Sequence, residues 1–217
     1  MKVSKRILPI IVFAQFCCTS LWFAGNGVMN ELVANFELLP SALGHLTSAV
    51  QVGFITGTLI FAVLSIADRF SPSRVFFMSA IIGALFNLAI IWEEHTLSTL
   101  LICRFMTGFF LAGIYPVGMK IASDYYQKGL GKSLSFLVGA LVIGTAFPHL
   151  LKDMTEAFLW KSVLIVTSIL AVVGGVLILL VVPDGPYRQA SRSIRLSAFF
   201  RVFHNRNFRS VALGYFG

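Results

Sequence analysis

Residues 159–182 read LWKSVLIVTSILAVVGGVLILLVV and are followed by the run PDGP at residues 183–186. Lys161 is the one charged residue in the first run. A transmembrane α-helix needs about 20 consecutive apolar residues, because each residue adds about 1.5 Å and the hydrocarbon core is about 30 Å thick. Proline lacks an amide donor and glycine permits a turn, so the second run ends the helix. The stretch therefore predicts a transmembrane helix with a sharp end at Pro183.

Five further apolar blocks of similar length precede this one. They cover residues 7–29, 41–66, 75–92, 99–122 and 134–151. Over the 217 residues, 57% are hydrophobic and 12% are charged, which is about half the charged share of soluble domains. A soluble domain could not cover so much apolar surface. We therefore predict an all-α fold, a polytopic membrane helical bundle with six transmembrane helices, the first too long to be a cleaved signal peptide.

The order of the blocks predicts a domain plan. Helices one to three and four to six have similar lengths and loop spacings, as in two inverted three-helix repeats, so residues 1–183 would form one six-helix half. In residues 184–208, arginines and phenylalanines recur at near-helical spacing; we expect a basic helix in the cytoplasmic interface, or else a solvated linker. Residues 209–217 begin a further apolar run that is too short to cross a bilayer. We expect a truncated helix seven and a missing C-terminal six-helix half.

Loop charges set the predicted orientation. The chain has 17 Lys and Arg residues against 9 Asp and Glu residues, and most of the cations lie in alternate loops. If the N-terminus is cytoplasmic, the opposite side keeps only Lys152 and Lys161 among the loop cations. Positive loops face the cytoplasm, where they meet anionic lipid. We expect a multi-pass protein of the cytoplasmic (inner) membrane with a cytoplasmic N-terminus, and no nucleic-acid partner.

The loop between helices two and three carries a charged pattern, ADRFSPSR, at residues 67–74. Asp68 can accept charge-assisted hydrogen bonds from cations on neighbouring helices. Such contacts would latch one side of the protein and break when two halves rock against each other. We predict Asp68, Arg69 and Arg74 as gating residues, with an ordinary solvated loop as the alternative.

Helix four contains an arginine inside an apolar span, in the run RFMTGFFLAGIYPVG at residues 104–118. A charge within a span is costly and usually functional, so Arg104 is a candidate for a cavity-facing site. Because it lies about 7 Å inside the outer edge at helical rise, it could instead snorkel to water. We expect Gly108, Gly113 and Gly118 to permit close helix packing rather than to contact a ligand.

Polar residues on several helices predict a shared central cavity. In helix one, a polar face is formed by Gln15, Thr19, Trp22 and Asn26, which recur at helical spacing. A polar stripe on a spanning helix should face water or another helix rather than lipid. For each residue, the alternative is a helix–helix hydrogen bond. The predicted solute-binding residues are Gln15, Asn26, Arg104, Tyr115 and His149.

Histidine titrates near neutral pH, so His45 and His149 are candidate carriers of a coupling proton. The three cysteines have no metal-ligand spacing, and the sequence lacks the nucleophile motifs and paired carboxylates that catalysis would need. We therefore expect no cofactor, no metal and no enzymatic activity.

The loop at residues 67–74 resembles the signature loop of the major facilitator superfamily, G-x-x-x-D-R-x-G-R-R/K. Asp68 and Arg69 match it, and Arg74 supplies the trailing cation one residue late. Leu64 and Ser71 stand where the family has glycines. The resemblance implies a gating role for this loop.

Helix four also resembles the family, because Arg104 is followed four residues later by Gly108. Several runs look like bacterial nitrate/nitrite and cyanate-type porters: YPVGMK at 115–120, LVGAL at 137–141, PHLL at 148–151 and PDGPYR at 183–188. Helix two lacks the arginine of those anion porters, so nitrate itself is not the expected substrate.

The resemblance implies a function as well as a fold. Members of the family move small solutes by alternating access between two six-helix halves, and helices one and four of this half would line the cavity. It therefore implies secondary active transport of a small solute, anionic if Arg104 binds it, with the bilayer and a coupling proton or ion as further partners. The alternatives are an inactive truncated remnant, a half-size homodimer, and a non-transporting scaffold or sensor.

Overall fold

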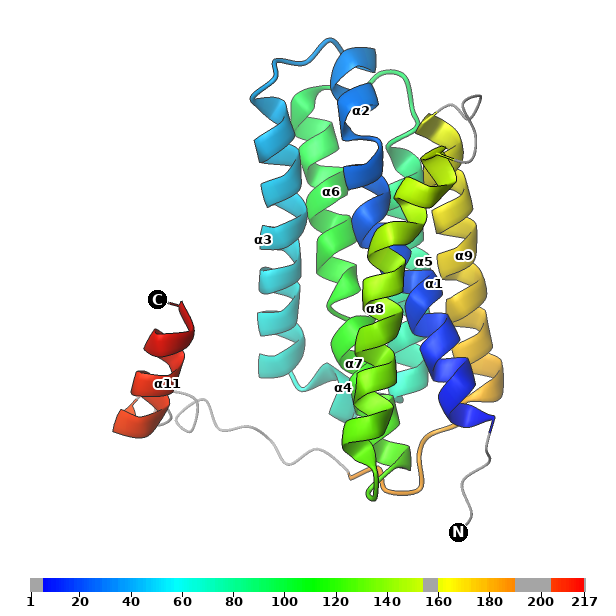
Figure 1. The fold of residues 1–217 in the computed structure, drawn as a ribbon, viewed down its shortest axis with the longest axis vertical. Coiled ribbons are helices and arrows are strands. Elements are labelled where there is room, and N and C mark those ends of the chain that lie inside the picture. Colours follow the sequence, from blue (N-terminus) through cyan, green and yellow to red (C-terminus); the bar gives the residue numbers. More distant parts are fainter. Residues whose placement is uncertain (1–5, 154–159, 190–203, 217) are drawn as a thin grey trace.

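The structure, a computed structural model, describes residues 6–153, 160–189 and 204–216. Within these ranges it is helical and contains no strand (Figure 1). Six spans are long and apolar enough to cross a membrane, which confirms the predicted all-α membrane bundle. In chain order they are α1 (Ile7–Gly27), α3 (Ala42–Val63), α5 (Pro72–Ala89), α6 with α7 (Leu97–Leu111 and Tyr115–Tyr125), α8 (Leu130–Asp153) and α9 (Trp160–Val181).

Short helices mark the two ends of the bundle. Helix α2 (Met29–Asn35) follows α1 at one end, and α4 (Ile66–Arg69) follows α3 at the other (Figure 1). We refer to these as the α2 end and the α4 end. The first residues of α1 and the loop between α7 and α8 also lie at the α4 end.

Several helix bounds differ from the prediction. The block at residues 99–122 is interrupted between Leu111 and Tyr115, because Pro116 cannot donate to the carbonyl one turn earlier and its ring crowds that turn. Helix α8 begins four residues before the expected start, directly after Gly129, whose φ of 77° provides the turn.

The last described helix also starts early. Helix α11 (Arg206–Phe216) begins three residues before the predicted boundary at 209, so the last residues of the predicted linker are helical. The expected interfacial helix falls largely on residues 190–203, which lie outside the described residues. The domain plan stays a prediction.

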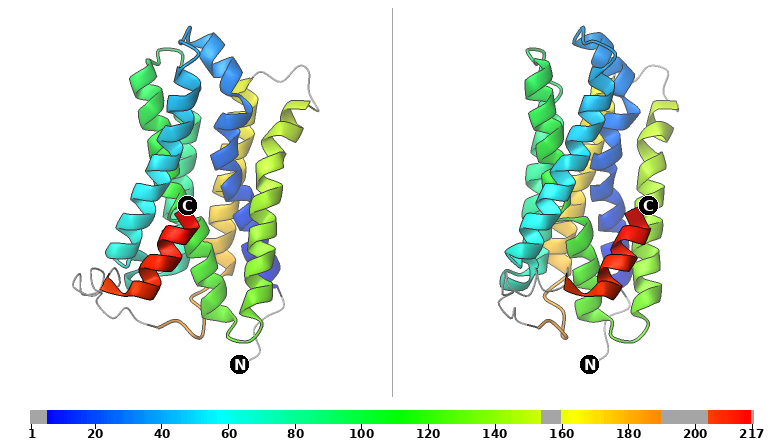
Figure 2. Two further views of the ribbon diagram at one scale, coloured as in Figure 1. Left: turned by 60° about the vertical axis from the view of Figure 1, so that its left-hand side comes forward. Right: turned by 90° about the vertical axis from the view of Figure 1, so that its left-hand side faces the viewer.

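The packing of the spans follows an inverted-repeat pattern. Helix α3, the second span, packs on α6 of the fourth, and α8, the fifth, packs on α1, the first (Figure 2). A second pair of contacts corresponds in the same way. Helix α1, the first span, packs on α9, the sixth, and α6, in the fourth span, packs on α5, the third. The remaining large interface joins α5 to α9. Exchanging spans one to three with spans four to six leaves this set of contacts unchanged, as two three-helix repeats require.

Glycines allow the closest of these contacts, between α3 and α6. A Cβ atom on Gly53 would lie 2.0 Å from the carbonyl oxygen of Phe105, and one on Gly108 would lie 2.0 Å from that of Val50. Small residues let membrane helices approach backbone to backbone. The packing role predicted for Gly108 is thus supported by the geometry.

The α2 end is held together by side chains of the loop between α5 and α6. The ring of His95 lies 2.7 Å from the carbonyl oxygen of Ala89 and 2.9 Å from Oγ1 of Thr99, so it joins the end of α5 to the start of α6. Lys161 of α9 donates a 2.8 Å hydrogen bond to Glu93 and lowers the pKa of that carboxyl below its ordinary value. The sequence had indicated His95 only as a loop residue.

Candidate functional site

Arg104 lies in α6 towards the α2 end and is 1% exposed. Its Nη2 atom donates a 2.7 Å hydrogen bond to Oδ1 of Asn26 in α1. Its Nε and Nη1 atoms have no hydrogen-bond partner, and no ion pair joins it to another described residue. The burial excludes the alternative that this side chain snorkels to water. A guanidinium with spare donors therefore sits between α1 and α6.

Gly25 makes room for the guanidinium. A Cβ atom there would lie 2.2 Å from Nη1 and 2.6 Å from Cζ of Arg104. The planar group therefore packs against the backbone of α1, next to the Asn26 side chain that it binds. The sequence prediction named Asn26 but missed Gly25, although glycines flank Asn26 on both sides at residues 25 and 27.

Gln15 occupies the other end of the contact between α1 and the fourth span. It is fully buried, and neither amide atom has a hydrogen-bond partner. Gly118 of α7 provides its space, since a Cβ atom there would lie 2.1 Å from Oε1. Thr19, one turn along α1, donates a 2.8 Å hydrogen bond to the backbone carbonyl of Gln15. In this structure Gln15 thus packs against α7, and the Thr19 hydroxyl is satisfied within α1.

The structure brings only some of the predicted binding residues together. Asn26 and Arg104 are in direct contact. Tyr115 is half-buried at the start of α7, and His149 is exposed on α8. Within the described part of the chain, no hydrogen bond links Gln15, Tyr115 or His149 to Arg104. Their binding roles stay predictions.

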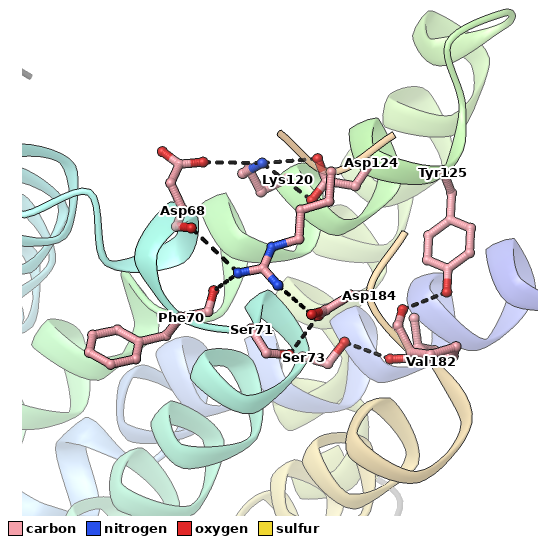
Figure 3. Close-up of polar contacts among 11 residues, drawn as sticks. Asp68, Phe70, Ser71, Ser73, Lys120, Asp124, Tyr125, Val182 and Asp184 are labelled. Atoms are coloured by element: carbon pink, nitrogen blue, oxygen red, sulfur yellow. Dashed lines mark hydrogen bonds and ion pairs between the residues drawn. The ribbon is translucent and has the colours of Figure 1, made fainter. Parts of the chain in front are cut away.

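A second polar group lies at the α4 end (Figure 3). Lys120 of α7 is placed between two carboxylates, with Nζ 3.1 Å from Asp68 and 2.9 Å from Asp124. Arg188 forms an ion pair with Asp184, four residues earlier in the segment that follows α9. We call these five residues the α4-end cluster. It contains Asp68, as predicted, but the cations that accompany it come from α7 and from the segment after α9.

The segment after α9 is held across the start of α5 (Figure 3). Arg188 donates to the carbonyl oxygens of Phe70 at 2.8 Å and Asp68 at 3.4 Å. Ser71 donates a 2.6 Å hydrogen bond to Asp184, and the amide of Tyr187 donates to the carbonyl of Asp124 at 3.0 Å. The ion pairs and backbone contacts therefore tie the end of the sixth span to the loop between the second and third.

Sequence reasoning treated Lys120, Asp124 and Arg188 only as loop charges, or as helix-end charges, that set the topology. The spacing of Lys120 and Asp124 held a usable signal, because residues four apart on one helix lie side by side and can pair. Asp184 and Arg188 lie beyond the end of α9, so helical spacing does not predict their ion pair. Arg69 and Arg74 are exposed, and neither forms an ion pair with a described residue. Their gating roles stay predictions.

Lys120→Met is expected to destabilise the protein more than Asp68→Asn. Asp124 has a side chain only 6% exposed, and removing Lys120 leaves that carboxylate buried without its cation, which costs about 2 kcal/mol after allowance for partial exposure. Asp68 is 39% exposed, so neutralising it costs about 0–1 kcal/mol. Thermal unfolding in detergent measures both. Equal losses would mean that Lys120 acts only as a surface cation.

Among the described residues, no group of three His, Cys, Asp or Glu side chains could hold a metal ion. The three cysteines are free and buried.

The sequence matches the family model described as Major Facilitator Superfamily over residues 11–217. The niacin transporter NiaP of Acinetobacter baylyi is 32% identical over 176 residues, which cover 69% of this chain and 38% of the relative. The MFS-type transporter acdC of Aspergillus candidus is 27% identical over 211 residues, which cover 96% of this chain and 40% of the relative.

The putative uncharacterized transporter YgaY of Escherichia coli is 23% identical over 177 residues, covering 78% of this chain and 43% of the relative. The chain therefore spans less than half the length of these curated relatives. None of the three is named as a nitrate, nitrite or cyanate porter, so they give the finer resemblance no support.

Proposed function

Because the chain belongs to the major facilitator superfamily, we propose that it forms the N-terminal half of a secondary transporter that moves a small anionic solute by alternating access. Family membership makes the protein a non-enzymatic, multi-pass membrane protein, as the sequence predicted. The identity of the solute, its charge and the coupling to a proton or ion are parts of the proposal.

The unpaired donors of Arg104 carry this proposal. An arginine buried without a counter-charge is costly, and an anionic group that reached the edge bearing Nε or the edge bearing Nη1 would offset that cost. Carboxylates match the guanidinium fork with two parallel hydrogen bonds. The half-buried Asn26, its present partner, offers the route by which such a group would approach. One relative is named for niacin, a carboxylic acid.

The remaining predicted site residues would complete the binding pocket. Gln15 has a buried amide with unused donors and acceptors, while Tyr115 and His149 lie nearer the surface of this half. In the proposal they face the solute together with the C-terminal half that the family fold supplies. His149 stays the predicted carrier of a coupling proton.

The proposed orientation puts the α4 end in the cytoplasm and the protein in the inner membrane. The loop cations at that end support it. In this orientation the α4-end cluster forms part of a cytoplasmic latch, with Asp68 and Lys120 at its centre. Arg69 and Arg74, both exposed beside this cluster, stay its predicted gating residues.

Competition between an anion and its uncharged analogue tests the anionic solute. Uptake of a labelled aromatic carboxylate is measured in proteoliposomes that contain the protein with its second half. The matching amide should compete at least about tenfold more weakly, because charge-assisted hydrogen bonds are worth about 1.5–3 kcal/mol. Equal competition would contradict the anion proposal. Absence of any solute flux, with a stable protein partner in a pull-down, would indicate the scaffold alternative.

A further inference from the structure

An apolar groove lies on the side of the bundle at the α4 end, away from Arg104. It has a volume of about 300 Å³ and runs between α3, α4, α5 and α6. Phe61, Met78, Ile82 and Phe110 form its apolar walls, and Arg74 is the cation at its mouth. Neither the solute site nor the α4-end cluster uses these side chains.

The groove faces outward on a part of α5 that is suited to lipid. Met78 is 53% exposed, and Leu85, two turns further on the same face, is 60% exposed. Phe70, beside Arg74 at the mouth, is 62% exposed. In a membrane bundle, polar residues turn inward and large apolar ones meet the acyl chains. The groove is therefore an exposed apolar surface of the kind that acyl chains cover.

The mouth of the groove carries positive charge that the protein does not neutralise. Arg74 lies in the first turn of α5 and Arg69 at the end of α4; both are exposed. The acidic residues nearby are already bound, since Asp68 contacts Lys120 and Asp184 contacts Arg188. No acidic side chain among the described residues forms an ion pair with either exposed arginine.

We propose that this groove binds one anionic phospholipid. Its phosphate lies at Arg74, with Arg69 close to the headgroup, and an acyl chain follows Met78 and Ile82 into the groove. From Arg74 to Ile82 the helix rises about 12 Å, so the groove holds the part of one acyl chain that lies nearest the headgroup. In the proposed orientation the site faces the leaflet that holds anionic lipid; the binding itself does not depend on that orientation.

Native mass spectrometry of the purified protein in detergent tests the site. Phosphatidylglycerol is compared with phosphatidylcholine of the same acyl chains, and one phosphatidylglycerol should be retained per chain in preference. R74Q should weaken this binding about fivefold, the effect of one cation near an anionic headgroup. The matched control K132Q removes an exposed cation from the α4 end of α8 and should leave binding unchanged.

Ile82→Trp separates the groove from the charge, because it fills the apolar channel and keeps both arginines. It should weaken phosphatidylglycerol binding as R74Q does, while circular dichroism and gel filtration show a normal fold. Soluble glycerol phosphate should not compete with the lipid. Equal weakening by R74Q and K132Q, equal binding of the two lipids, an unchanged affinity in I82W, or displacement by glycerol phosphate would each overturn the proposal.

Discussion

Gly108→Ala is expected to leave little folded protein. The new Cβ atom would lie 2.0 Å from the carbonyl oxygen of Val50 and 2.9 Å from its carbonyl carbon. Both are backbone atoms of α3, so no side-chain rotation can relieve the collision. The two helices must move apart, which also opens the contact that Gly53 makes with Phe105 on the same seam. We expect a loss of about 3 kcal/mol or more, at the upper end of overpacking effects.

Thermal unfolding in detergent, followed by circular dichroism, measures this loss. Gly44→Ala is the matched control, because a Cβ atom at that position of α3 meets nothing within 4 Å. The control should change stability by at most about 1 kcal/mol, and in the favourable direction, since alanine favours a helix over glycine. A Gly108→Ala protein that unfolds at the wild-type temperature would mean that α3 and α6 are not packed through their backbones.

The spans could be predicted because the bilayer imposes a length and a composition on each helix. The interruption at residues 112–114 was missed, although Pro116 was visible, because an apolar block does not reveal where a helix within it breaks. Arg104 was identified as a candidate site residue because a charge inside a transmembrane span is costly. The need for Gly25 was not predicted, since it depends on how closely α1 approaches α6, and a single sequence does not encode that distance locally.

The α4-end cluster shows which contacts the sequence could not predict. The loop signature pointed to Asp68, and the structure confirms that its carboxylate contacts a cation on a neighbouring helix. That cation is Lys120, which the sequence offered only as one positive charge among many. Beside it, the segment around Arg188 docks on the same loop through the backbone carbonyls of Asp68 and Phe70. Carbonyls are present at every residue, so such contacts leave no trace in side-chain patterns.

Arg104→Gln is expected to lower uptake of the carboxylate about a hundredfold in proteoliposomes while the protein stays folded. Glutamine can still donate to Asn26 but carries no charge, so it loses the charge-assisted hydrogen bonds to the solute, worth about 1.5–3 kcal/mol. Removing a buried charge that lacks an ion-pair partner is neutral or stabilising. The unfolding temperature should therefore not fall. Arg104→Lys keeps the charge without the planar fork and should give an intermediate rate.

Gly25→Ala provides an independent route to the same loss, because it leaves Arg104 in the sequence and displaces its guanidinium. The collision at 2.2 Å is with the end of a flexible side chain, so the arginine can move and the fold should survive. Gly139→Ala, where a Cβ atom meets nothing within 4 Å, should transport normally. If Gly25→Ala and Arg104→Gln both fold and both retain wild-type uptake, the arginine serves only to join α1 to α6, and the solute must bind elsewhere.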